Sequence, residues 1–252
     1  MHKLSITIIT KNEEHNIKRC LDSVKWADEI IIVDSGSVDK TIDICREYGC
    51  KIIETEWRGF GKTKQLAVNN ASNDWILSVD ADEIITEDLK DEIISLLSND
   101  PPLFGYRIKR RSFYLGKRIS FCGWDRDYTL RLFNRQHGAF NDKPVHESVR
   151  INGDIGHLKG MMLHYTYPTI DSHYVKMKRY ADIGAQNLYQ KGRNSNPGMA
   201  IIRGIFKFIK MYIFQLGFLD GKHGFLLSYN SAWGVYLKYL LLWEMNRSKS
   251  SI

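Results

Sequence analysis

Cysteine is scarce in this sequence. The four cysteines among 252 residues form neither a C-x-x-C pair nor any paired pattern. Their spacing argues against a zinc site and a disulfide scaffold, and it is typical of buried, reduced thiols in a cytosolic protein. A signal-peptide cleavage site is also lacking, because the apolar run "LSITII" leads directly into "TKNEE". We therefore expect the protein to stay in the cytoplasm.

Two phosphate-binding motifs are absent as well. No G-x-x-x-x-G-K-[ST] sequence occurs, which excludes a P-loop NTPase. No G-x-G-x-x-G follows the first predicted strand, which excludes a Rossmann dehydrogenase. The loop "TKNEE" found there is acidic and contains no glycine, whereas a sugar nucleotidyltransferase needs a Gly-rich basic loop to hold a triphosphate.

Charge is abundant and unevenly distributed. The net charge is +7, yet residues 1–103 hold 12 Lys and Arg against 20 Asp and Glu, while residues 104–252 hold 24 against 9. The basic second part predicts an anionic partner such as a phosphate, a nucleic acid or a membrane surface.

The order of apolar patterns predicts the fold class. The first hundred residues alternate β-branched runs such as "LSITIIT" with helical patterns such as "NIKRCLDSV". This alternation is typical of right-handed βαβ units, and it predicts an α/β fold with a mostly parallel central sheet. Short mixed segments after Pro101 and Pro102 predict an antiparallel addition, and helical patterns follow Pro168 to the end.

The segment "SVDADE" packs three carboxylates into four positions after an apolar run. Like charges so close together repel one another, so a cation is expected nearby, and a metal ion is the first candidate. Because strand side chains alternate, Asp80 and Asp82 point to the same side. Mg²⁺ or Mn²⁺ takes such oxygen ligands and leaves coordination positions for a diphosphate.

Three polar clusters are predicted to share one edge of the sheet. "TKNEE", "VDSGS" and "VDADE" each follow a predicted strand, and ligands of open α/β sheets bind at the carboxyl ends of strands. Taken singly, Asp34 or Asp82 could equally cap the following helix. The three clusters together favour a ligand site.

These segments resemble a known family. "SITIITKNEEHNIKRCLDSV", "IIIVDSGSVDKTIDI", "GKTKQLAV" and "WILSVDADE" look like the successive motifs of inverting family 2 glycosyltransferases, which have a GT-A fold. The resemblance covers residues 1 to about 167. The later segment "FLDGKHGFLLSYNSAWGVYLKYLLLWE" is similar to the bacterial subgroup that extends the lipopolysaccharide core.

The resemblance implies roles for individual residues. Those implied to contact a UDP-sugar donor are Thr10, Lys11, Glu13, Asp34, Lys62 and Asp80. Asp82 and His164 are implied to hold Mn²⁺ or Mg²⁺. By residue chemistry alone, Glu13 could instead be an acid favoured in a first helical turn, Lys62 a solvated helix residue, and His164 a core histidine beside "MML".

The resemblance also implies a carboxylate base on a later segment. The family usually has E-D there, and here His146-Glu147 in "KPVHESV" takes its place, so we expect Glu147 to be the base, with Asp142 as the rival. In "GWDRDYTLRLFNR", an aromatic face could stack on a sugar and guanidinium groups could bind phosphate. The candidate acceptor contacts are Trp124, Arg126 and Arg131, although ordinary strand faces also look like this.

The C-terminal part predicts a membrane-surface helix. In "MAIIRGIFKFIKMYIFQL", Arg203, Lys207 and Lys210 lie on one helical face with apolar residues around them, as in interfacial helices. Residues 225–243 are interrupted by Asn230 and Lys238, so a packed or second interfacial helix is favoured over a spanning one. Two ordinary buried helices remain the alternative. Nucleic acid is not expected as a partner, because the cations stand beside aliphatic runs and no nucleic-acid-binding motif occurs.

The sequence thus predicts a metal-dependent, inverting hexosyltransferase. It would move a hexose, with glucose expected, from a UDP-sugar to a lipid-linked saccharide such as lipopolysaccharide core, as a peripheral protein on the inner face of the cytoplasmic membrane. We expect residues 1–103 to bind the nucleotide sugar, 104–168 to face the acceptor, and 169–252 to form the basic, aromatic extension. The alternative is a noncatalytic protein that binds sugar nucleotides or glycans.

Overall fold

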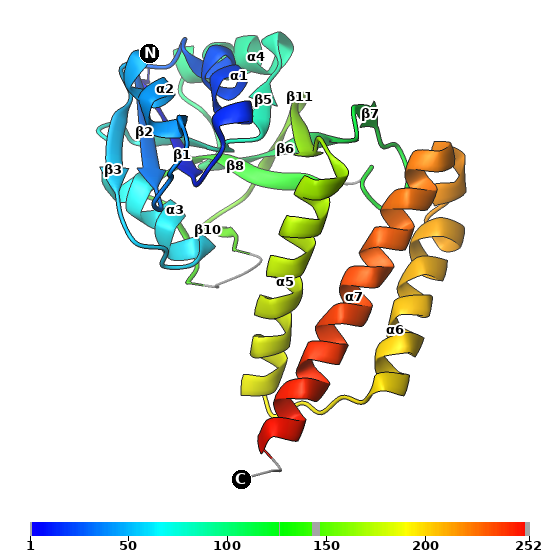
Figure 1. Cartoon of the computed structure of the whole chain (residues 1–252). Coiled ribbons are helices and arrows are strands. Elements are labelled where there is room, and N and C mark those ends of the chain that lie inside the picture. Colours follow the sequence, from blue (N-terminus) through cyan, green and yellow to red (C-terminus); the bar gives the residue numbers. More distant parts are fainter. Residues whose placement is uncertain (1, 126, 143–146, 250–252) are drawn as a thin grey trace. The chain divides into compact units, whose positions relative to one another are not determined.

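The chain forms two compact units in a computed structural model (Figure 1). The model describes residues 2–125, 127–142 and 147–249, and it describes Lys249 by its backbone alone. The first unit comprises Met1–Arg110 and Asp127–His164, and the second comprises Arg111–Arg126 and Tyr165–Ile252. These two units do not coincide with the functional parts predicted from the sequence at residues 1–103, 104–168 and 169–252. That functional division stays a prediction.

The first unit is built on a sheet with a parallel part and an antiparallel part. The parallel part runs in the order β3 (Lys51–Glu54), β2 (Glu29–Asp34), β1 (Leu4–Thr10) and β4 (Trp75–Asp80). The sheet continues through β8 (Tyr128–Asn134), β6 (Gly105–Tyr114), β11 (Gly156–Tyr167) and β5 (Glu83–Ile85). The end of β6 pairs with β7 (Lys117–Arg118), and the residues of this pairing belong to the second unit. Strands β9 (Gly138–Phe140) and β10 (Val149–Ile151) form a separate pair. The predicted α/β class, with a mostly parallel sheet and an antiparallel addition, is confirmed.

Helices cover both faces of the parallel strands. They are α1 (Glu14–Val24), α2 (Thr41–Glu47), α3 (Phe60–Asn69) and α4 (Glu87–Ser98). Ile6 and Ile8 belong to a core with residues of α1 and α4, whereas Ile31 and Val33 belong to a core with residues of α3. Strands buried on both faces need nearly continuous apolar runs, which explains "IIIV" in β2. Each fully buried aliphatic side chain contributes about 1.5–3 kcal/mol, so these cores hold the strand ends firmly in place.

The second unit consists largely of three helices: α5 (Ile170–Gln190), α6 (Pro197–Ile209) and α7 (Gly221–Lys249). A π-helical turn (Lys210–Phe214) and a 3₁₀ turn (Gly217–Asp220) connect the last two. Thr169 and Ser172 form a reciprocal capping box at the start of α5, and Asn196 caps α6 through the Met199 N–H. Helix α7 packs against both α5 and α6. The predicted helical extension is confirmed.

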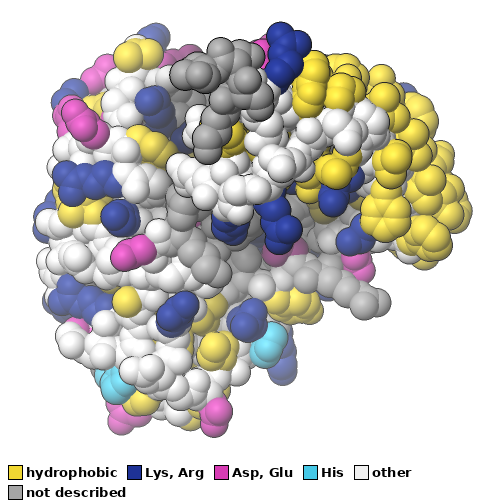
Figure 2. All heavy atoms as spheres, turned by 90° about the horizontal axis from the view of Figure 1, so that it is seen from below, with side chains coloured by type: hydrophobic (Ala, Val, Ile, Leu, Met, Phe, Trp, Pro, Cys, Tyr) yellow, Lys and Arg dark blue, Asp and Glu magenta, His cyan; other side chains and the backbone are white. Residues whose placement is uncertain are grey.

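Helix α6 turns an apolar face outward. Figure 2 shows hydrophobic side chains gathered on one side of the molecule, and on α6 itself Ile202 is 68% exposed and Phe206 is 63% exposed. The buried side of α6 is formed by Ala200 and Gly204 instead. None of the helices in the described part of the chain combines the length and apolarity needed to cross a bilayer.

Candidate functional site

The three predicted polar clusters meet at one edge of the first unit. Strands β1, β2 and β4 are parallel, and their registers set Thr10 beside Asp34 and Ile9 beside Asp80. Their carboxyl ends therefore lie at the same edge, where ligands of such sheets bind. The hydroxyl groups of Thr10 and Ser35 are buried here without a hydrogen-bond partner among the described residues. Buried hydroxyls in that state are available to a polar ligand.

The loops after β1 and β2 are tied to each other. The Asn12 side chain accepts a hydrogen bond from the Val38 N–H at 2.8 Å, and the Asn12 N–H donates to the Ser37 hydroxyl at 2.8 Å. The buried carboxylate of Asp34 accepts from the N–H groups of Gly36 and Ser37 at 2.9 and 2.8 Å. Asp34 thus shapes the turn that follows its own strand.

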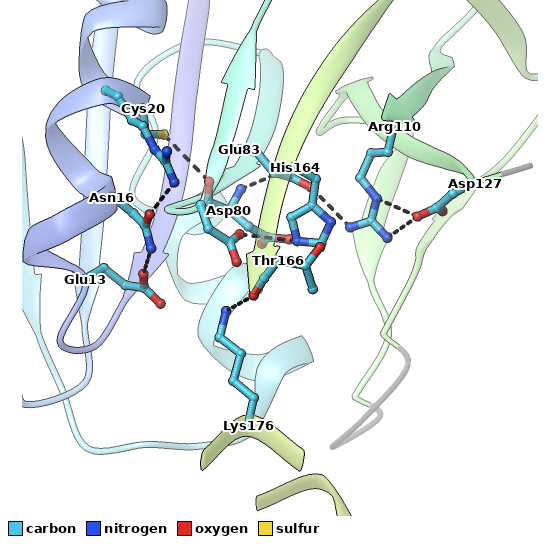
Figure 3. A network of polar contacts seen from close by, with 12 residues as sticks. Glu13, Asn16, Cys20, Asp80, Glu83, Arg110, Asp127, His164, Thr166 and Lys176 are labelled. Atoms are coloured by element: carbon cyan, nitrogen blue, oxygen red, sulfur yellow. Dashed lines mark hydrogen bonds and ion pairs between the residues drawn. The ribbon is translucent and has the colours of Figure 1, made fainter. Parts of the chain in front are cut away.

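Glu13 and Lys11 lie in the loop that follows β1. A Glu13 carboxylate oxygen accepts a hydrogen bond from the Asn16 side chain at 2.7 Å, which holds Glu13 against the first turn of α1 (Figure 3). Lys11 is exposed. The donor roles predicted for these two residues stay predictions.

Asp80 lies between two basic side chains. The Lys64 Nζ is 2.8 Å from Asp80 Oδ1, and the Arg131 guanidinium forms an ion pair with Asp80 Oδ2. Although burial favours the neutral acid, Arg131 and Lys64 hold the pKa of Asp80 well below its usual range. Asp80 is therefore an anion whose charge is balanced by protein groups.

Lys64 also contacts the predicted base. Its Nζ is 2.8 Å from Glu147 Oε1 as well as from Asp80, and only 4% of the Lys64 side chain is exposed. One ammonium group thus joins the strand-end carboxylate of Asp80 to Glu147, which lies 83 positions beyond Lys64 in the sequence. Lys64 was not predicted as a site residue.

Glu83 is neutralised in the same way. Its carboxylate pairs with Arg131 at 2.8 Å and with Arg110 at 3.1 Å, and it accepts from the Asp80 N–H at 2.9 Å. Arg110 also pairs with Asp127 (Figure 3). Two of the three carboxylates in "SVDADE" thus have basic side chains as partners, so the crowding alone does not require a metal ion.

Asp82 has a different partner. Its Oδ1 lies 3.5 Å from His164 Nε2, and both side chains are largely buried. Strand β11 brings His164 opposite Glu83 of β5, which explains how residues so distant in sequence meet. A carboxylate oxygen suits Mn²⁺ or Mg²⁺ when a diphosphate and water complete the coordination, whereas an imidazole nitrogen is more typical of a transition-metal site than of a Mg²⁺ site. Among the described residues, no group of three His, Cys, Asp or Glu forms a larger candidate metal site.

The two lysines of "GKTKQ" have opposite environments. Lys62, the predicted donor contact, is exposed, whereas Lys64 is buried. Residues two apart on a helix point about 200° from each other. Gly61, Lys64 and Val68 share the buried face of α3, so the helical period could have singled out Lys64.

We expect Lys64→Met to destabilise the first unit by about 3 kcal/mol, because it leaves the Asp80 and Glu147 carboxylates without their shared cation. Urea unfolding of the whole chain measures this effect. Lys62→Met is the matched control on the same helix, and it should change stability by less than about 0.5 kcal/mol. Equal stability of the two variants would contradict the assignment of Lys64.

The remaining predicted residues have varied surroundings. Arg131 is 5% exposed and forms ion pairs with Asp80 and Glu83, and the acceptor contact predicted for it stays a prediction. Trp124 belongs to the second unit, where its ring centroid is 6.3 Å from that of Tyr167. Asp142 is exposed, and Arg126 and His146 lie outside the described residues.

Comparisons with known proteins show which sequences this chain resembles. The family model described as "Glycosyl transferase family 2" matches residues 5–147. A glycosyltransferase of Rickettsia typhi, named as uncharacterized, is 31% identical over 100% of this chain and 90% of its own length. The lipopolysaccharide core biosynthesis glycosyltransferase LpsC of Rhizobium meliloti is 27% identical over 94% of this chain and 93% of its own length.

Solved structures resemble the chain more distantly. The structure of S. aureus TarS 1–349 in complex with UDP has a TM-score of 0.49 and 17% sequence identity. The match covers 98% of this chain and 92% of that one.

Proposed function

Because this chain belongs to glycosyl transferase family 2, we propose that it transfers a hexose, with glucose expected, from a UDP-sugar to a lipid-linked saccharide. The transfer inverts the anomeric carbon and uses Mn²⁺ or Mg²⁺. The similarity to a lipopolysaccharide core glycosyltransferase over nearly the whole chain supports an acceptor of that class.

The link from Asp80 through Lys64 to Glu147 carries this proposal. Asp80 stands at the strand ends where the donor is expected, and Glu147 is held on the other side of the same ammonium group at 2.8 Å. Inversion in one step needs a base that takes the proton of the acceptor hydroxyl as that hydroxyl attacks the anomeric carbon. In the proposed mechanism Glu147 is this base and Lys64 sets the position of its carboxylate.

Asp82 and His164 are the proposed metal ligands. Their 3.5 Å contact supports this, since the two side chains already point at each other. A bound divalent ion would neutralise the charge that develops on the departing diphosphate. Thr10 and Ser35, whose buried hydroxyls have no partner among the described residues, would bind the nucleotide with Lys11, Glu13 and Asp34.

We further propose a peripheral position on the inner face of the cytoplasmic membrane. The exposed apolar face of α6 supports this position, as does the charge of residues 165–252, which hold 12 Lys and Arg against 4 Asp and Glu. The protein would bind its lipid-linked acceptor at that membrane surface.

A thermal-shift screen of UDP-sugars with Mn²⁺ tests the donor class. A ligand at 100 times its Kd stabilises the folded protein by about 2.7 kcal/mol, so we expect UDP-glucose to raise Tm by roughly 5–10 °C. The shift should shrink when Mn²⁺ is replaced by EDTA. ADP-glucose is the matched control for the base, and it should give a smaller shift.

An assay of UDP-glucose hydrolysis separates the enzyme from a noncatalytic binding protein. A chain that binds UDP-glucose should also hydrolyse it slowly and release UDP if the catalytic groups are functional. Binding without any release of UDP, with or without a lipopolysaccharide acceptor, would contradict the transferase assignment. No shift with any UDP-sugar would contradict the donor assignment.

A further inference from the structure

The second unit contains a pocket to which the proposed transfer assigns no role. Its volume is about 610 Å³, and Arg193, Arg203 and Tyr239 line it together with the apolar side chains of Leu188 and Met199. The lining comes from the end of α5, the connection to α6, α6 itself and α7. A pocket with cationic and apolar walls suits a ligand that has an anionic group beside an apolar part.

Two cations converge on one aromatic ring beside this pocket. The Arg203 guanidinium carbon is 4.6 Å from the centroid of the Tyr239 ring, and the Lys238 Nζ is 5.0 Å from the same centroid. The stem of Lys238 lies against Gly184, where a Cβ would come within 2.7 Å of Lys238 Cδ. Helices α5, α6 and α7 therefore hold these cations in place at the pocket.

The cations near the pocket lack carboxylate partners. Within the described part of the chain, no ion pair joins Arg193, Arg203, Lys207 or Lys238 to an acid. Burial, with Lys210 and Lys238 nearby, lowers the pKa of Lys207. Burial, with Arg203 nearby, lowers the pKa of Lys238. Like charges gathered in this way are stabilised when an anion binds among them.

The outer face of α6 indicates where that anion comes from. Ile201, Ile202, Ile205 and Phe206 are each more than half exposed, and they follow the pocket residue Met199 along the same helix. An apolar face with cations at its border is typical of a helix that lies in the headgroup region of a membrane. A free anion in water would bind the cations but would leave this apolar face uncovered.

We propose that the pocket of the second unit binds the phosphate diester of an anionic phospholipid, with Arg193 and Arg203 as its phosphate contacts and the α6 face among the lipid chains. This inference rests on the proposed membrane association. It makes that association more specific, because it identifies one lipid group and the residues that bind it. It is separate from the residues proposed to bind the sugar donor.

Binding of monomeric dihexanoyl phosphatidylglycerol, measured by calorimetry below its micelle concentration, tests the pocket. We expect the parent chain to bind it and Arg193→Gln/Arg203→Gln to bind it about 30-fold more weakly, since a cation near anionic lipid contributes about fivefold. Lys25→Gln/Lys222→Gln removes the same charge from exposed lysines elsewhere, and it should bind within about twofold of the parent. Equal losses in the two variants would overturn the pocket in favour of general charge attraction.

Sedimentation with phosphatidylcholine vesicles, with and without phosphatidylglycerol, tests the docking. The Ile202→Ser/Phe206→Ser variant should no longer bind vesicles. Its affinity for soluble dihexanoyl phosphatidylglycerol should match that of the parent. Displacement of the soluble lipid by equimolar inorganic phosphate would overturn the lipid assignment. The lipid assignment would also be overturned if the parent chain were a dimer that does not bind vesicles and the Ile202→Ser/Phe206→Ser variant were a monomer. UDP-glucose thermal shifts of every variant should match the parent, so failure of the lipid site and failure of the donor site are distinguishable.

Discussion

Glu147→Gln is expected to lower the rate of sugar transfer by roughly 10²–10⁴-fold, the usual contribution of a general base. Glutamine keeps the shape of the side chain but cannot take the proton of the acceptor hydroxyl. The effect should fall on kcat, while the affinity for UDP-glucose changes little. Because Glu147 Oε1 is 2.8 Å from Lys64 Nζ, the variant also loses an ion pair, and its Tm must be measured alongside its rate.

Asp142→Asn is the matched control for this prediction. Asp142 comes from the same segment and is exposed, so its replacement removes the same charge without touching Lys64. Its transfer rate should stay near that of the parent. If transfer instead persists in Glu147→Gln and collapses in Asp142→Asn, then Asp142 is the base and the role proposed for Lys64 in holding it is wrong.

Asp82→Asn should reduce metal-dependent transfer by about 100-fold or more, because a neutral amide is a weaker ligand for a hard cation than a carboxylate. Direct measurement of Mn²⁺ binding in the presence of UDP, by the electron paramagnetic resonance of free Mn²⁺, should show a weaker affinity in parallel. Partial recovery of the rate at high Mn²⁺ is expected.

Asp88→Asn is the matched control for the metal site. Asp88 is an exposed acid in the first turn of α4, six positions beyond Asp82, and its replacement also removes one negative charge. It should bind Mn²⁺ like the parent. Undiminished transfer by Asp82→Asn at ordinary Mn²⁺ concentrations would show that Asp82 is no metal ligand in this chain.

The contrast between Lys62 and Lys64 illustrates the limit of motif matching. The motif "GKTKQLAV" covers both lysines, but a motif does not say which of them faces the sheet, and the donor contact predicted for Lys62 stays a prediction. Burial distinguishes them, since Lys64 is 4% exposed and Lys62 is on the solvent side. The buried neighbours Gly61 and Val68 carry that information in their helical spacing.

The carboxylates of "SVDADE" illustrate a second limit. Their crowding correctly predicted positive charge nearby, but the partners of Asp80 and Glu83 are Lys64, Arg110 and Arg131. These basic residues come from a helix and two later strands. Nothing in the local sequence indicates such partners, because ion pairs between distant segments depend on how the sheet is assembled.

The sequence by itself determined the α/β class, the parallel strands and the edge where the polar clusters meet. Apolar periodicity is a local property of the sequence, and a helix between consecutive strands favours their parallel pairing. Only the tertiary structure decided which charges meet. The pairing of Asp82 with His164 depends on the register of β5 against β11, and the pairing of Lys64 with Glu147 depends on a contact across 83 positions. Such contacts follow from the packing of whole elements, because an ion pair is set by distance in space and not by distance along the chain.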